Sequence, residues 1–164
     1  MKRAIYFYET AAARGLLASQ NNLGTIYRDG KGVEQNFERA RYWFQKASAR
    51  AQRCSSFMRS WVCASLTATQ AAENGLAQAM FNLGTMCALG QGAEQDVVAA
   101  AEWYKLAAEK DLPGAQFAYA NSLLTGQGVE KDEVQALIWV ETAAAQGHAK
   151  AQEALPFYRQ SAGK

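Results

Sequence analysis

One phrase recurs three times in the sequence and constrains the fold more than any other feature. The copies are GKGVEQNFERARYWFQKA from Gly30, GQGAEQDVVAAAEWYKLA from Gly90 and GQGVEKDEVQALIWVETA from Gly126. The last two copies start 36 residues apart, and the first two start 60 residues apart. A fixed period of this length is typical of helical arrays in which each unit packs only against its neighbours. The chain is therefore predicted to be a stack of repeated units.

Each unit is predicted to hold two helices. The first helices are LLASQNNLGTIYRD from Leu16, LAQAMFNLGTMCAL from Leu76 and LPGAQFAYANSLLT from Leu112, and another begins at His148. Their buried stripe follows helical spacing, as at Leu76, Ala79, Leu83, Gly84 and Cys87. The second helices are predicted to begin at the good N-cap residues Asn36, Asp96 and Asp132.

Small and large residues alternate at fixed repeat positions. Gly24, Gly84 and Ala120 share one position inside the first helices. Because a glycine there costs about 0.5–1 kcal/mol relative to alanine, we expect a neighbouring helix to pass very close. The tryptophans of the second helices, which lie beside alanines, are interpreted as core rather than as a stacking platform for nucleic-acid bases: Trp43, Trp103 and Trp139.

The Gly-x-Gly pairs have two interpretations. A phosphate-binding loop would place the glycines between a strand and a helix, with a lysine at a fixed position. Here the pairs lie between two predicted helices, and Lys31 is replaced by Gln91 and Gln127 in the other copies. The pairs therefore favour a helix C-terminus followed by a tight turn.

With these motifs in place, the units resemble Sel-one-like repeats (SLR), which are relatives of tetratricopeptide repeats. The resemblance rests on AAENGLAQAMFNLGTMCALGQGAEQDVVAAAEWYKLAA from Ala71 and on AAEKDLPGAQFAYANSLLTGQGVEKDEVQALIWVETAA from Ala107. It implies an all-α fold with no β-sheet: an α-solenoid in which antiparallel helix pairs form a right-handed superhelix. Departures from the family pattern are local, as at Ala93 in place of valine and Asp111 in place of glycine.

The length of 164 residues suits a single domain, residues 1–164. The predicted units are 1–10 (partial), 11–46, 47–70 (degenerate), 71–106, 107–142 and 143–164 (partial). Residues 48–70 show neither Leu-Gly nor Gly-x-Gly, but a stripe of Cys54, Phe57, Met58, Trp61, Cys63 and Ser65 predicts helix there. Two origins stay open for this segment: a degenerate unit, or the product of a compensated frameshift in the gene.

The resemblance implies a non-enzymatic scaffold or adaptor that binds a protein or peptide, of a kind that bacteria use in signalling, secretion or host contact. One alternative is the cysteine-rich branch of the family, associated with β-lactam binding or weak hydrolysis. Cys54, Cys63 and Cys87 do not recur at the repeat interval, so they match that branch poorly. Another alternative is a fragment of a longer repeat protein with no independent role.

The sequence offers no catalytic set, and no cofactor or metal is expected. His148 is the single histidine and shares its repeat position with leucines, so a packing or helix-start role is favoured over a general base. No cysteine or histidine pairs have the spacing of metal ligands. The net charge of +2, without a basic stripe, favours neither nucleic acid nor an anionic membrane as a partner.

The predicted partner site is the concave groove that first helices line in stacked repeats. Polar residues next to the buried stripe can pair with a bound peptide or helix, although solvated surface residues have the same pattern: Asn22, Thr25, Arg28, Asn82, Thr85 and Asn121. Ile5, Phe7 and Tyr8 lack a preceding helix, which predicts a homodimer through open repeat ends or an upstream extension. Without a visible signal peptide, a cytoplasmic location is expected.

Overall fold

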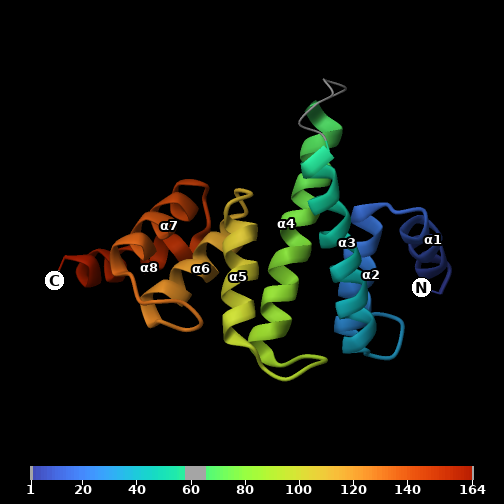
Figure 1. The fold of residues 1–164 in the computed structure, drawn as a ribbon, viewed down its shortest axis with the longest axis horizontal. Coiled ribbons are helices and arrows are strands. Elements are labelled where there is room, and N and C mark those ends of the chain that lie inside the picture. The colour runs from blue at the N-terminus through green and yellow to red at the C-terminus, as the bar shows by residue number, and fades with distance from the viewer. Residues whose placement is uncertain (1, 58–65, 164) are drawn as a thin grey trace.

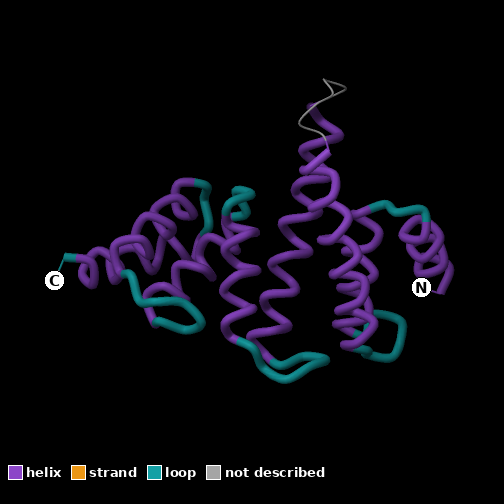
Figure 2. Tube along the Cα trace, in the orientation of Figure 1, coloured by secondary structure: helices purple, strands orange, loops and turns teal. Residues whose placement is uncertain are grey.

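The structure is a computed structural model that describes residues 2–57 and 66–163, with side chains at 5–48 and 75–163. Within these ranges the chain forms eight α-helices and no strand (Figure 2). They are α1 (Lys2–Ala13), α2 (Leu17–Asp29), α3 (Phe37–Phe57), α4 (Leu66–Leu89), α5 (Val97–Ala108), α6 (Pro113–Thr125), α7 (Glu133–Ala145) and α8 (Ala149–Ala162). The predicted all-α solenoid is confirmed.

Each helix packs against the helix that follows it, so the chain advances in one direction from α1 to α8 (Figure 1). The predicted first helices are α2, α4, α6 and α8, and the second helices are α1, α3, α5 and α7. Helix α2 also contacts α4 directly. The first helices α2 and α4 therefore lie next to each other in the stack.

The Gly-x-Gly pairs form the turns from first to second helices, as predicted. Gly30, Gly90 and Gly126 cap their helices in the left-handed conformation, with φ of 68°, 65° and 72°. The next helix is then capped by a side-chain oxygen, since the Oδ1 atoms of Asn36, Asp96 and Asp132 accept bonds of 2.8–2.9 Å from backbone amides three residues on. Each turn therefore provides hydrogen-bond partners both for carbonyls at the end of the first helix and for an amide at the start of the second helix.

Three of the turns from second to first helices are held by a glutamine that was not predicted from the sequence. Gln20 and Gln152 each donate a 3.0 Å bond from Nε2 to a carbonyl in the last turn of the preceding helix, and Gln116 does so at 3.4 Å. All three lie at one repeat position. The side chain thereby satisfies a carbonyl that the end of the helix leaves without an intrahelical donor.

The glutamine-held turn is not repeated between α3 and α4, because Gly75 and Met80, at its repeat positions, lie inside α4. Helix α3 has 21 residues and α4 has 24, against 12 and 13 for α5 and α6, and the two long helices extend beyond the rest of the stack (Figure 1). The helix predicted over 48–70 is confirmed for residues up to Phe57 and from Leu66, whereas Met58, Trp61, Cys63 and Ser65 lie outside the described residues. The unit boundaries proposed around 47–70 stay predictions.

Glycine at the crossing of first and second helices makes room for an aromatic ring. A Cβ atom at Gly24 would lie 2.5 Å from Phe44 Cε1, and one at Gly84 would lie 2.7 Å from Tyr104 Cδ1. In the next unit Ala120 and Val140 occupy the same two positions, and both are fully buried in one cluster. The close approach predicted from these glycines is therefore present.

The predicted buried stripe is confirmed on α4, where Leu76, Ala79, Leu83 and Cys87 are at most 5% exposed. The tryptophans at the repeated position, Trp43, Trp103 and Trp139, are partly buried and pack against the core. At the N-terminal end, the expectation that Ile5 is uncovered was wrong, because it is buried in a cluster with Leu23 and other residues of α2 and α3. Phe7, in contrast, is 70% exposed.

Candidate protein-binding face

The six candidate residues lie on the first helices, in stripes that follow helical spacing. On α4 the stripe contains Gln78, Phe81, Asn82, Thr85 and Leu89. The corresponding stripes of α2, α6 and α8 contain Asn22, Asn121 and Phe157 respectively. We call the surface formed by these four stripes the first-helix face.

Asn82 links two successive first helices instead of facing solvent. It is 6% exposed, its Oδ1 accepts a 3.2 Å bond from Arg28 Nη1, and its Nδ2 donates a 3.2 Å bond to Asn21 Oδ1. Gln78 Nε2 adds a longer bond of 3.4 Å to the same oxygen. The structure thus brings Arg28 and Asn82 together, and adds Asn21 and Gln78, which sequence reasoning missed although they share the same helical stripes.

Asn121 makes a similar link further along the stack. Its Oδ1 accepts a 2.7 Å bond from the hydroxyl of Tyr158 on α8, and its Nδ2 donates to Phe117 O at 3.1 Å. Tyr158 is 2% exposed, and this burial raises the pKa of its phenol to about 12. Asn121 lies in a different network from Arg28 and Asn82, so the six candidates do not form one cluster.

The remaining candidates differ in their solvent exposure and in whether their polar side-chain atoms are already hydrogen-bonded. Thr25 and Thr85 are half-buried and each donates its hydroxyl to a carbonyl four residues earlier in its own helix. Asn22 is exposed. Of the three asparagines named from the sequence, Asn22 is therefore the one whose side chain lies open to a partner.

A charged group borders this face at the end of α2. Arg28 Nε donates a 2.8 Å bond to Asp29 Oδ1, and Lys31 Nζ lies 2.8 Å from Asp29 Oδ2. The bond from Arg28 and then that from Lys31 hold the pKa of the Asp29 carboxyl below its usual range. Asp29 is thus an ionised acceptor with both oxygens already paired.

Apolar residues on the first-helix face were missed by sequence reasoning. Leu89 is 63% exposed and Phe157 is 59% exposed, and both lie in the same helical stripes as the polar candidates. Phe81 and Phe117 are half-buried between units, with Phe117 packing against the His148 ring at 5.3 Å. Their helical spacing from Asn82 and Asn121 was the signal that would have found them. The face consequently combines amides with exposed apolar groups.

Histidine and cysteine, residue types that often take part in catalysis or metal binding, have structural surroundings in the described part of the chain. No set of three or more histidine, cysteine or acidic side chains among the described residues is placed to hold a metal ion. His148 caps α8, because its Nδ1 accepts a 3.2 Å bond from the Ala151 amide. Cys87 is buried without a disulfide, and desolvation raises the pKa of its thiol, whereas a nucleophilic cysteine needs a lowered one. Over the same residues, no helix has the length and apolar character needed to cross a bilayer.

Comparison with known proteins agrees with this geometry. A family model described as the Sel1 repeat matches residues 1–16, 17–51, 77–112 and 113–148, and so leaves out the segment around the long α3–α4 hairpin. A solved structure of a Sel1 repeat protein from Oxalobacter formigenes is 31% identical, has a TM-score of 0.70, and the match covers 94% of this chain and 98% of that chain.

A second solved structure is more distant. It is that of a protective antigen present in uropathogenic Escherichia coli strains, which displays an SLR fold. It is 27% identical with a TM-score of 0.51, and the match covers 96% of this chain and 36% of that chain. A comparison with curated proteins found no match.

Proposed function

The chain belongs to the Sel1 repeat family, and from this premise we propose that it is a non-catalytic scaffold that binds a protein or peptide on its first-helix face. The observation that carries the proposal is the composition of that face. Exposed Leu89 and Phe157 supply apolar anchors, and Asn22 supplies an amide that can pair with a backbone. Aromatic and aliphatic anchors beside unpaired polar groups are the usual composition of a peptide-binding groove.

The two asparagines that link successive first helices take a supporting part in this proposal. Asn82 and Asn121 hold successive first helices together, through Arg28 and Tyr158 respectively, and so set the spacing of the groups that face the partner. Thr25 and Thr85 belong to the same surface. Binding energy would come from the exposed anchors, while the paired residues keep the face rigid before the partner arrives.

The test is a selection of peptides from a displayed random library against the immobilised chain, followed by binding measurements on purified variants. One variant, Asn22→Ala/Leu89→Ser/Phe157→Ser, changes the first-helix face. The matched control, Val134→Ser/Ile138→Ser, changes residues of α7 that are 60% and 56% exposed, comparable with Leu89 and Phe157.

We expect selected peptides to bind the wild type and the control alike and to lose at least tenfold in affinity with the first-helix variant. Equal binding to all three proteins would move the site away from this face. Failure to select any peptide would count against a peptide-binding scaffold as such.

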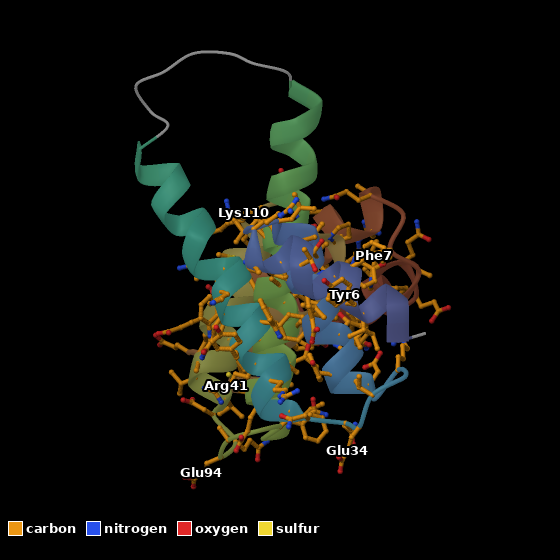
Figure 3. All side chains as sticks on the ribbon, turned by 90° about the vertical axis from the view of Figure 1, so that its right-hand side faces the viewer. Tyr6, Phe7, Glu34, Arg41, Glu94 and Lys110 are labelled. Atoms are coloured by element: carbon orange, nitrogen blue, oxygen red, sulfur yellow. The ribbon has the colours of Figure 1, made fainter. Side chains whose placement is uncertain are left out.

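A homodimer through the N-terminal end of the stack is a second proposal, supported by two exposed aromatic residues there. Tyr6 and Phe7 on α1 are 67% and 70% exposed at the N-terminal end, which faces the viewer in Figure 3. Sedimentation of the wild type and of Tyr6→Ser/Phe7→Ser at several concentrations tests it. A wild-type monomer throughout would exclude the dimer; a dimer lost in the variant would support it.

A further inference from the structure

A hollow of about 340 Å³ lies between α3, α4, α5 and the loop that leads into α5. Cys87 and Trp103 line it, together with Ala93 and Ala99, and Arg41 and Glu94 bring charge to its rim. Figure 3 shows Arg41 on α3 and Glu94 on the loop, both on the same side of the molecule. This hollow is separate from the first-helix face, and nothing about it depends on the function proposed above.

The residues that line the hollow depart from the repeat pattern. Three of them are smaller than their repeat partners: Cys87 replaces Tyr27 and Leu123, Ala93 replaces Val33 and Val129, and Ala99 replaces Arg39 and Gln135. A fourth is charged where its partners are apolar, since Arg41 corresponds to Ile5, Ala101 and Leu137. Four departures, from three helices and a loop, thus converge on one place.

The N-terminal unit shows what fills the equivalent space. There the ring of Tyr27 is 5% exposed, the Arg39 guanidinium lies 5.4 Å from the ring centroid, and the Tyr27 hydroxyl donates a 3.0 Å bond to Glu9. Val33 is half-buried and packs against the same cluster. Because Cys87 and Ala99 replace Tyr27 and Arg39, the hollow has lost a group the size of an aromatic ring.

The charged residues around the hollow differ in whether they already have a hydrogen-bond partner. Asp96 lines it, but its Oδ1 already accepts a 2.9 Å bond from the Ala99 amide as the N-cap of α5. Glu94 is exposed to solvent. Within the described part of the chain, Arg41 makes neither a hydrogen bond nor an ion pair, although guanidinium groups pair readily with carboxylates. The Arg41 guanidinium is thus the charged group in the hollow that remains available to pair with a ligand.

We propose that this hollow binds an aromatic ring that carries a carboxylate, with the ring against Trp103 and the carboxylate on Arg41. The ring of such a ligand would fill the space that Tyr27 fills in the N-terminal unit. Its carboxylate would provide a counter-ion for Arg41. Two sources share this chemistry: a free aromatic carboxylic acid, and the C-terminal residue of a peptide that ends in an aromatic side chain.

The experiment uses the full chain and four probes in calorimetric titrations: phenylpropanoate, its amide, a short peptide ending in phenylalanine, and the same peptide amidated. For a ligand of this size we expect a dissociation constant on the order of 1 mM or tighter. A shift of the Trp103 indole N–H resonance, assigned with Trp103→Phe, places the site.

Two variants restore residues that the repeat itself uses, so the fold is expected to tolerate them. Ala93→Val narrows the hollow, as at Val33 and Val129, and Arg41→Leu removes the cation, as at Leu137. The matched control, Val129→Ala, opens the same position in the next unit, where Ala101 stands in place of Arg41.

We expect carboxylate binding to fall at least tenfold in Ala93→Val and in Arg41→Leu and to stay unchanged in Val129→Ala. Binding of the free acid alone identifies a small molecule as the source, and binding of the unamidated peptide identifies a chain terminus. The proposal is overturned if neither carboxylate binds, if the amides bind as well as the acids, or if the two variants bind like the wild type.

Discussion

Where first and second helices cross, one residue on each helix sets how closely the pair approaches. Gly24 meets Phe44, Gly84 meets Tyr104, and the third pair uses Ala120 with the smaller Val140. The larger partner thus goes with glycine and the smaller one with alanine. This exchange of volume between two helices explains why a residue of poor helix propensity occupies the middle of α2 and α4.

We predict that Gly24→Ala destabilises the protein by about 1–3 kcal/mol, because the added Cβ would overlap the Phe44 ring. On an exposed helix the same change would stabilise by about 0.5–1 kcal/mol. Urea unfolding of the wild type, Gly24→Ala, Phe44→Val and the double variant measures the coupling. The double variant should be more stable than the sum of the single losses implies, and strict additivity would show that the two residues do not share this space.

Tyr158 is predicted to make the stability fall in alkaline solution. Its folded-state pKa of about 12 lies above the ordinary tyrosine pKa of about 10, so the unfolded chain loses the phenolic proton first. The stabilisation is complete below pH 10 and is lost as the pH rises from about 10 through about 12, with a magnitude on the order of 1–3 kcal/mol. Unfolding at a series of pH values should show a shallower fall in Tyr158→Phe, and an identical slope in both proteins would contradict a buried phenol.

At the scale of elements, α4 contains a repeat position that forms a turn in other units. Gly15 and Gly147 adopt φ of 87° and 85° in their turns, whereas Gly75, at the same repeat position, lies inside α4. The repeat position of Gln20, Gln116 and Gln152, whose side chains hold the other turns, is occupied here by Met80, which is 2% exposed. Because α3 continues past this point, its carbonyls are satisfied within the helix and no glutamine is needed.

This difference gives opposite predictions for one substitution. Gly75→Ala should stabilise the chain by about 0.5–1 kcal/mol, since a Cβ there meets nothing closer than 3.9 Å and alanine favours helix. Gly147→Ala should destabilise it by about 1–2 kcal/mol, because an alanine is strained in the left-handed region. Thermal unfolding of both variants tests the pair; a loss of stability in Gly75→Ala would mean that α4 begins after that residue.

The same elements show what the sequence could and could not predict. N-caps at Asp96 and Asp132 and the glycine turns were predictable, because each depends on the chemistry of a few adjacent residues. The long α3–α4 hairpin was not predictable in this way, because Gly75 is a glycine like those in the turns at Gly15 and Gly147. The sequence difference that marks the hairpin is Met80 in place of the glutamine that holds those turns. Burial of Asn82 was equally hidden, because its partners Arg28 and Asn21 come from another unit.

Over the whole molecule, the buried residues whose side chains the structure describes form two core clusters that meet on α4. Leu83, Met86 and Ala79 belong to a cluster shared with α1, α2 and α3, whereas Leu76 and Met80 belong to one shared with α5 to α8. Trp103 packs against both clusters. Because each unit contacts only its neighbours, the two ends of the stack depend on each other through this central helix.

Two substitutions at one repeat position test this coupling. Leu23 on α2 and Leu83 on α4 are 0% and 2% exposed, so an alanine in either place should cost about 2–5 kcal/mol. Leu23→Ala should raise amide hydrogen exchange in α1 to α3 and leave α6 to α8 unchanged, since it weakens only the N-terminal cluster. Leu83→Ala should raise exchange on both sides, because loosening α4 also releases Leu76 and Met80 from the second cluster. If both variants raised exchange uniformly along the chain, the stack would unfold as a single unit, and α4 would have no special part in joining its ends.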